Sequence, residues 1–272
     1  MTALRCLYCD LDGTLLGRGA SLLHDGEGSF TLLGVRALEA CHRAEVEVVL
    51  YSGRRRAQVH EDARLIGSTA FIYEVGCGLV VDGEEEFLTD DLVPAERTIH
   101  DQITQSGAPA LLLERYAGRL EYHAPWHLDR DVSHLFRGLV DTGEVDDLLR
   151  DHGMGNVRLI DNGVIHRRSP TLEVERAHAY HLIPAGASKA RAVARHMQLR
   201  GYAREECIAV GDSREDMEAA GAVGTFWLVA NAVRRDPTIP EAIAGRDNVR
   251  VAEAAHGAGV YEAVVTTLAE AR

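Results

Sequence analysis

Residues 4–14 read Leu-Arg-Cys-Leu-Tyr-Cys-Asp-Leu-Asp-Gly-Thr, and the rest of the chain is organised around this stretch. The mostly apolar residues 4–9 predict a short buried strand. Asp10 and Asp12 follow the strand directly, and Gly13 permits a tight turn just beyond its end. Two neighbouring carboxylates are costly to bury unless a cation or hydrogen bonds compensate. The stretch therefore predicts either a polar functional site at the strand end or a solvated Asp-Gly turn.

The composition is ordinary for a soluble globular protein and predicts one or two domains, with 272 residues of which 46% are hydrophobic and 26% charged. The formal charge is −13, from 29 basic and 42 acidic residues. A surface this acidic argues against a nucleic-acid or anionic-membrane partner. No apolar run approaches the roughly 18 residues that a membrane span needs, and no signal peptide is evident at the N-terminus.

Five scattered cysteines, an odd number, predict reduced thiols in a cytoplasmic protein rather than a disulfide framework. Cys6 and Cys9 are spaced like a pair of metal ligands. Residues three apart on a strand point to opposite faces, however, so these two cannot bind one ion together. We expect both to pack in the core.

Apolar runs that predict strands alternate with segments of helical periodicity, both before residue 83 and after residue 184. This alternation predicts an α/β fold built on a doubly wound parallel sheet. Strands are expected at residues 46–51, 70–73, 207–210 and 226–229, and helices at residues 34–44, 54–66 and 188–197.

Residues 84–183 depart from this alternation and hold short mixed elements, including helical patterns at residues 132–139 and 145–150. A stretch of this length is within the usual size range of a domain. We therefore expect an inserted α+β domain at residues 84–183, between two parts of the core at residues 1–83 and 184–272.

Polar residues stand at the ends of several predicted elements. In a doubly wound sheet, ligands bind beyond the carboxyl ends of the strands. Because these residues follow strands or begin helices there, we expect them to converge on one site: Asp10 and Asp12, Ser52 with Gly53 and Arg54, Lys189, and Asp212 with Asp216.

Residues 10–14, Asp-Leu-Asp-Gly-Thr, resemble the first motif of the haloacid dehalogenase (HAD) superfamily. The segment 52–54 is similar to the second motif of that family, Lys189 to the third, and Asp212 with Asp216 to the fourth. The insert has the position and length of a type C2 cap, subclass IIB, and residues 183–189 resemble the same junction in sucrose-phosphate and mannosyl-3-phosphoglycerate phosphatases. The resemblance implies a capped, Mg2+-dependent phosphatase acting on a small phosphorylated metabolite, such as a sugar or sugar-acid phosphate.

The resemblance also implies roles for the core residues, and the chemistry of phosphoryl transfer supports them. Asp10 would attack phosphorus and form an aspartyl-phosphate. Asp12 would protonate the leaving alkoxide and then activate water. Ser52, Gly53 and Lys189 would hold the phosphoryl oxygens and stabilise the charge of the transition state.

Mg2+ is the expected cofactor, because a cation would offset the repulsion between a carboxylate nucleophile and a phosphate dianion. The expected ligands are Asp10, Asp212 and a backbone oxygen of Asp12. Asp216 and Ser213 are expected to orient Lys189 or the metal ligands rather than to bind the metal directly.

The sequence departs from the family pattern at two positions. Glu215 stands where the family often has Asn before the second acidic residue of the fourth motif. Val75 stands where the family often has the Asn of Glu-Asn-Gly. We expect these departures to affect substrate contacts more than chemistry.

A cluster of aromatic and basic residues in the insert contains the candidates for contacts to the leaving group. The candidates are Trp126, His127 and Arg130, together with Arg54 of the core; Tyr122 and His123 belong to the same cluster. The alternative for each is packing in the small core of the insert or a solvated surface.

Two other functions are compatible with these motifs. A phosphomutase with a similar cap would transfer the phosphoryl group to a second substrate position instead of water. A non-catalytic module would bind a ligand without turnover. The presence of both first-motif carboxylates, Lys189 and the acidic fourth motif favours an enzyme.

Overall fold

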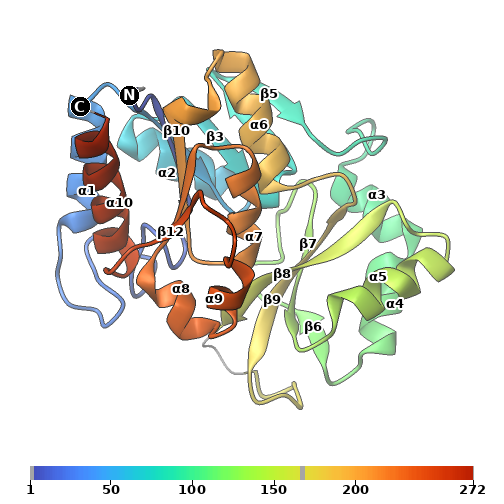
Figure 1. Ribbon diagram of the computed structural model, residues 1–272. Helices are drawn as coiled ribbons and strands as arrows, with labels where there is room; N and C mark the ends of the chain where they lie inside the picture. Colours follow the sequence, from blue (N-terminus) through green and yellow to red (C-terminus); the bar gives the residue numbers. More distant parts are fainter. Residues whose placement is uncertain (1–2, 166–168, 272) are drawn as a thin grey trace.

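The structure is a computed structural model that describes residues 3–165 and 169–271, and its strands form two sheets (Figure 1). The larger sheet has eight strands in the order β12-β11-β10-β1-β2-β3-β4-β5. The six strands from β12 to β3 run parallel, and β4 and β5 close one edge as an antiparallel hairpin. The bounds are β1 (Cys6–Cys9), β2 (Glu47–Tyr51), β3 (Ala70–Tyr73), β4 (Gly78–Val81), β5 (Glu84–Phe87), β10 (Cys207–Gly211), β11 (Thr225–Leu228) and β12 (Val249–Val251).

Helices cover both faces of the large sheet, which confirms the doubly wound α/β fold. One face packs against α1 (Leu33–Arg43), α2 (Arg56–Ile66) and α10 (His256–Glu270). The other face packs against α6 (Lys189–Arg200), α8 (Ala230–Arg235) and α9 (Ile239–Ala242). Side chains along β1 alternate between the two cores, because successive strand residues point to opposite faces. Cys6 accordingly lies in one core and Cys9 in the other, both as buried free thiols.

The smaller sheet has four antiparallel strands in the order β6-β7-β9-β8, and Figure 1 shows it with its helices beside the large sheet. Its apolar side chains form a core of their own with the helices of the insert. The bounds are α3 (Ile99–Ser106), α4 (Ala108–Arg115), β6 (Leu120–Tyr122), β7 (His134–Gly138), α5 (Thr142–Asp151), β8 (Val157–Ile165) and β9 (Ala177–Pro184).

Two expectations for the insert differ from the structure. Residues 132–139 are not helical, because residues 134–138 form strand β7 between β6 and β9. Residues 84–87, expected at the start of the insert, form strand β5 and extend the large sheet beyond β4. The strands of the small sheet come instead from residues 120–184, of which residues 166–168 lie outside the described part of the chain.

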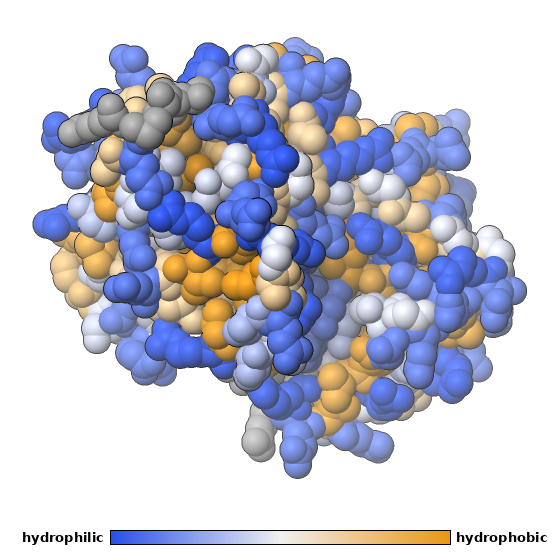
Figure 2. Space-filling model, in the orientation of Figure 1, coloured by the Kyte–Doolittle hydropathy of each residue, from blue (hydrophilic) through white to orange (hydrophobic). Residues whose placement is uncertain are grey.

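The outer surface agrees with the acidic composition. Figure 2 shows that hydrophilic residues predominate on the face drawn there and that apolar residues gather in smaller patches. Within the described residues, no helix has both the length and the apolar character needed to span a bilayer.

Candidate active site

The loop after β1 directs its two carboxylates differently. Asp10 is 5% exposed, and its backbone N–H donates to the carbonyl of Val210 at 3.0 Å. Gly13 has a φ of +88°, so the expected turn forms with the residue best suited to it. The side chain of Asp12 is 55% exposed and faces the cavity mouth.

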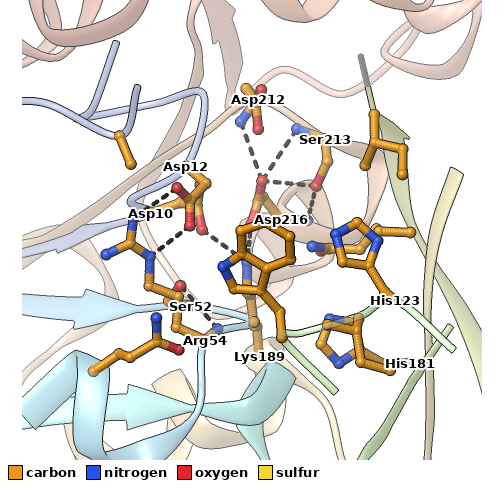
Figure 3. Close-up of a pocket in the computed structure, with 18 of the residues that line it drawn as sticks. Asp10, Asp12, Ser52, Arg54, His123, His181, Lys189, Asp212, Ser213 and Asp216 are labelled. Atoms are coloured by element: carbon orange, nitrogen blue, oxygen red, sulfur yellow. Dashed lines mark hydrogen bonds and ion pairs between the residues drawn. The ribbon is translucent and has the colours of Figure 1, made fainter. Parts of the chain in front are cut away.

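Arg54 binds both carboxylate oxygens of Asp12, with Nε donating at 2.6 Å and Nη2 at 2.7 Å. The same guanidinium donates from Nη1 to Asp62 at 2.8 Å. A two-pronged Arg–carboxylate pair fixes the direction of both groups. Figure 3 shows this pair beside Asp10, with Ser52 just below it.

Lys189 lies at the start of α6, as expected, and Ser188 caps the helix by accepting the backbone N–H of Arg191 at 3.1 Å. The Lys189 ammonium is buried among three carboxylates, at 3.1 Å from Asp10, 2.5 Å from Asp216 and 3.1 Å from Glu215. Burial alone would lower the pKa of Lys189, but these carboxylates raise it well above its ordinary value. Lys189 is therefore a fixed cation next to Asp10.

Asp216 is held by the turn that follows β10. Its Oδ2 accepts the backbone N–H groups of Asp212 and Ser213, each at 3.1 Å, and the Ser213 hydroxyl at 2.7 Å. Its Oδ1 accepts from Lys189. Both oxygens are thus occupied by protein donors, which fits an orienting role.

Asp212 lies on the opposite side of the site from Arg54 (Figure 3) and meets groups from α8. Arg235 forms an ion pair with its Oδ2 through Nη1, and the Asn231 side-chain amide lies 3.4 Å from the same oxygen. Burial raises the pKa of Asp212 to about 7, although Arg235 opposes the shift. Burial likewise raises the pKa of Asp10 well above its usual range, despite Lys189.

The acidic groups have the character of a divalent-cation site. Oxygens of Asp10, Asp212 and Asp216 lie within 4.8 Å of one another. The side chains of these three carboxylates and of Glu215 are buried beside the buried Lys189 ammonium and the partly exposed Arg235 guanidinium. Hard cations such as Mg2+ prefer oxygen ligands, and an added positive charge would compensate the raised pKa values of Asp10 and Asp212. The residues present therefore fit Mg2+.

Ser52 follows β2 and is 1% exposed, with its Oγ accepting the backbone N–H of Arg54 at 3.2 Å. Helix α2 begins at Arg56, two residues later than expected. The Gly53 amide therefore belongs to the loop and not to the first turn of the helix. Ser52 and Gly53 nevertheless line the same cavity as Asp10.

The insert places its own side chains across this cavity. Trp126 and Arg130 line it as expected, and His123 and His181 face the carboxylates from the side opposite Arg54 (Figure 3). His127 is not among the described residues that line it, because its ring stacks on Tyr122 with centroids 4.9 Å apart.

Arg130 is buried and makes mainly structural contacts. Its Nη1 donates to the Gly53 carbonyl at 3.1 Å and to the Ser133 hydroxyl at 3.0 Å, and its Nε donates to the Trp126 carbonyl at 3.0 Å. These bonds join the insert to the loop after β2. A direct contact between Arg130 and a leaving group would have to compete with them.

Glu74, in the turn after β3, is a second connection between the two sheets. Its fully buried carboxylate accepts the backbone N–H groups of Asp131, Val132 and Ser133 at 2.9, 3.3 and 2.6 Å, and the Ser133 hydroxyl at 2.7 Å. Several donors around one carboxylate offset the cost of burying its charge. Residues 131–133 are therefore held at the edge of the large sheet.

Two adjoining cavities lie between the sheets. The inner cavity, of about 490 Å³, contains the core motifs and is lined by Asp10, Asp12, Ser52, Lys189 and Asp212 among others. The outer cavity, of about 790 Å³, runs from Asp12 and Asp212 toward β8, α8 and α9. The two share Asp12, His123 and Asp212, so a molecule reacting at Asp10 could extend into the outer cavity.

Comparisons with known proteins agree with this arrangement. Residues 165–239 match a family model described as haloacid dehalogenase-like hydrolase. A phosphoglycolate phosphatase of Methanoculleus marisnigri is 27% identical over 270 residues, covering 96% of this chain and 95% of that protein. An HMP-PP phosphatase of Klebsiella pneumoniae is 26% identical, covering 82% of this chain and 83% of its own length.

The fold agrees with a solved structure along its whole length. The sucrose-phosphatase of Synechocystis matches with a TM-score of 0.66 and 14% identity, over 98% of each chain. The chain is thus similar to haloacid dehalogenase-like hydrolases over residues 165–239 and to the sucrose-phosphatase in its fold.

Both departures from the pattern of haloacid dehalogenase-like hydrolases lie outside the two cavities as described above. The Glu215 carboxylate lies 3.1 Å from the Lys189 ammonium, and burial raises the pKa of Glu215 to about 7. Val75 is buried in the core of the insert with a left-handed φ of 61°, a conformation that Asn tolerates better than a β-branched residue. Their observed contacts are with Lys189 and with the core of the insert, and the effect of the two departures on substrate contacts stays a prediction.

Three residues with contacts at or next to the site were not predicted from the sequence. Asn231 donates to the Gly13 carbonyl at 2.8 Å, Arg235 pairs with Asp212, and Glu74 binds the insert. Glu74 directly follows β3 and Asn231 comes soon after β11, so their places near strand ends were a usable signal. Arg235 carried no such signal, because its partner is brought to it only by the folded chain.

Proposed function

We propose that this phosphatase requires Mg2+ and hydrolyses a small phosphorylated metabolite, a sugar or sugar-acid phosphate, through an aspartyl-phosphate. One observation carries the proposal: buried Asp10 lies 3.1 Å from the Lys189 ammonium, within a cluster of carboxylates at the carboxyl edge of the parallel sheet. The relatives named phosphoglycolate phosphatase and HMP-PP phosphatase support the reaction class.

In the proposed mechanism Asp10 attacks phosphorus in line with the leaving oxygen, and the phosphoryl group moves from that oxygen to the Asp10 carboxylate. Ser52, the Gly53 amide and Lys189 hold the equatorial oxygens as charge develops. Asp12 gives a proton to the leaving alkoxide, and then takes one from the water that hydrolyses the intermediate. For this, Asp12 must exchange Arg54 for the substrate.

Asp10, Asp212 and the backbone carbonyl of Asp12 would hold Mg2+, with Asp216 and Ser213 orienting the neighbouring groups. When bound, the ion would supply positive charge that lets an anionic nucleophile approach an anionic phosphate. Asp216 is assigned the orienting role because Lys189, Ser213 and two backbone amides already occupy its oxygens.

We further propose that the insert acts as a cap that excludes water and supplies contacts to the leaving group, from Trp126 and His123 at the cavity wall. The division into a core and a cap follows the two sheets, with β5 assigned to the core. We also propose a cytoplasmic location, on the reduced and buried cysteines.

The test is the Asp10→Asn variant, assayed by phosphate release from a panel of sugar phosphates and phosphoglycerates. We expect turnover to fall by about a thousandfold or more, because a neutral amide cannot form the acyl-phosphate. Circular dichroism and thermal melting should show a folded protein, and the wild type should lose activity in excess EDTA. Substantial turnover by folded Asp10→Asn would refute the nucleophile, and conversion of a sugar phosphate to its positional isomer would indicate a mutase instead.

A further inference from the structure

Helix α8 directs a cation onto the carboxylate that we assign to the metal. Asn231 and Arg235 are four residues apart and therefore lie on one side of the helix, where both reach Oδ2 of Asp212. The Arg235 side chain is 31% exposed, against 8% for Asp212, and Arg235 lines the outer cavity. Its guanidinium thus lies between the metal ligands and the larger of the two cavities.

Arg235 and a metal ion compete for the same oxygen. Two cations that share one carboxylate oxygen repel each other strongly in a buried site. Under the proposed function, a divalent ion bound to Asp212 therefore displaces the Arg235 guanidinium. The displaced group remains at the wall of the outer cavity and needs a new anionic partner, because the Arg235 side chain is only 31% exposed.

The other carboxylates among the described walls of the outer cavity already have a partner side chain: Asp12 has Arg54 at 2.6 Å, Asp161 has the His178 ring at 2.7 Å, and Asp236 has Arg214 at 2.6 Å. With these carboxylates engaged, and with Asp12 turned to the leaving group in the proposed mechanism, the anion available to Arg235 is one that enters the cavity, and the molecule that enters it is the substrate.

We propose that Arg235 binds a second anionic group, a carboxylate or a phosphate, on the leaving-group side of the substrate. This inference rests on the proposed phosphatase function and narrows its substrate class to phosphate compounds that carry a further negative charge. The planar guanidinium suits two-pronged binding of either anion. Metal binding and substrate recognition are linked through Asp212, since the ion that enters there turns Arg235 toward the substrate.

The experiment compares Arg235→Gln with Arg234→Gln. Arg234 is the exposed neighbour on the same helix, so its replacement removes the same charge without touching either described cavity. The substrates are two pairs that differ by a carboxylate: phosphoglycolate against ethyl phosphate, and 3-phosphoglycerate against glycerol 3-phosphate. Steady-state kinetics at saturating Mg2+ give KM and kcat for each.

We expect the wild type to have the lower KM for the carboxylate-bearing member of at least one pair. Arg235→Gln should raise that KM by about tenfold or more, the range of a lost charged hydrogen bond, and change kcat by less than about threefold. The KM of the partner that lacks the carboxylate should stay unchanged in Arg235→Gln, and KM and kcat for both members of the pair should stay unchanged in Arg234→Gln. The inference would be overturned if Arg235→Gln raised KM equally for both members of a pair. It would also be overturned if the wild type had no lower KM for the carboxylate-bearing member of either pair.

A second measurement needs no turnover. Titration calorimetry of the substrate-free protein with MgCl2 should show tighter binding to Arg235→Gln than to the wild type or Arg234→Gln, because an internal competitor for Asp212 is gone. Weaker binding would assign Arg235 a merely structural role and overturn the inference. A wild type that hydrolyses none of the esters nor p-nitrophenyl phosphate would instead refute the proposed phosphatase function itself.

Discussion

Asp12 and Arg54 form an ion pair that the proposed mechanism would have to break. Arg54 occupies both carboxylate oxygens of Asp12, at 2.6 and 2.7 Å, and is itself anchored by Asp62. A carboxylate bound in this way has no free oxygen aligned for a leaving group. In the proposed mechanism, the pair would hold Asp12 beside the inner cavity until a substrate replaces Arg54 as its partner.

We expect Asp12→Asn to slow hydrolysis of alkyl phosphates by roughly a hundredfold to ten-thousandfold, the range of general acid catalysis. p-Nitrophenyl phosphate should lose less than about tenfold, because its leaving group needs little protonation. The measurement is kcat on both substrates, with Asp62→Asn as the control that disturbs Arg54 but leaves Asp12 in place. Equal losses on the two substrates would argue against the acid role.

The site residues that could be predicted from the sequence are those that stand at the end of a strand or at the start of a helix. Asp10, Ser52, Lys189 and Asp212 follow strands or begin a helix, and the parallel sheet brings them to one edge. Arg235 could not be predicted in this way, because its role depends on how α8 is oriented relative to the loop after β10.

Among the elements, strand β7 differs most from its expected form. Val132, Leu135, Phe136 and Leu139 recur at helical spacing, yet residues 134–138 are a central strand. The strand is buried on both faces, with Leu135 toward the inner cavity and Phe136 in the core of the insert. A strand covered on both sides lacks the alternation that identifies one from sequence. The strands of the large sheet were easier to predict, because apolar runs ended by polar turns mark them clearly.

His134, on β7, is a buried histidine whose protonation we expect to lower the stability of the insert. It is 1% exposed, stacks on His100 with centroids 3.9 Å apart, and lies 3.2 Å from the Tyr122 hydroxyl. Burial, and after it the neighbouring His100, lowers the pKa of His134 to about 4 from an ordinary 6.5. Burial also lowers the pKa of His181, on the adjacent strand β9.

We therefore expect the free energy of unfolding to fall as pH drops from about 6.5 to 4. In that window the unfolded chain binds a proton that buried His134 rejects, so stability is complete above 6.5 and decreases below it. The contribution of His134 is on the order of 3 kcal/mol at most. Urea unfolding of His134→Gln should show a shallower pH dependence, whereas replacement of the exposed His152 by Gln should leave the curve unchanged. An identical slope in His134→Gln and the wild type would contradict the assignment.

At the scale of the whole molecule, the two sheets together form the candidate active site. The large sheet supplies the carboxylates, Ser52 and Lys189, and the small sheet and its loops supply His123, Trp126 and His181. The α/β core and the presence of an insert were predictable from sequence patterns. The contacts that join the sheets were not, because they link Glu74 to residues 57 to 59 positions away and Gly53 to Arg130.

The Glu74 carboxylate has a consequence for the timing of access to the site. One side chain accepts the amides of Asp131, Val132 and Ser133, so lifting the insert releases all three at once. Hydrogen–deuterium exchange should therefore show them exchanging at a common rate, slowed by Mg2+ with inorganic phosphate and accelerated in Glu74→Gln. Three unrelated rates would mean that these bonds break separately. If the rate is shared, it would measure how often the insert lifts, and under the proposed mechanism how often water gains access to the aspartyl-phosphate at Asp10.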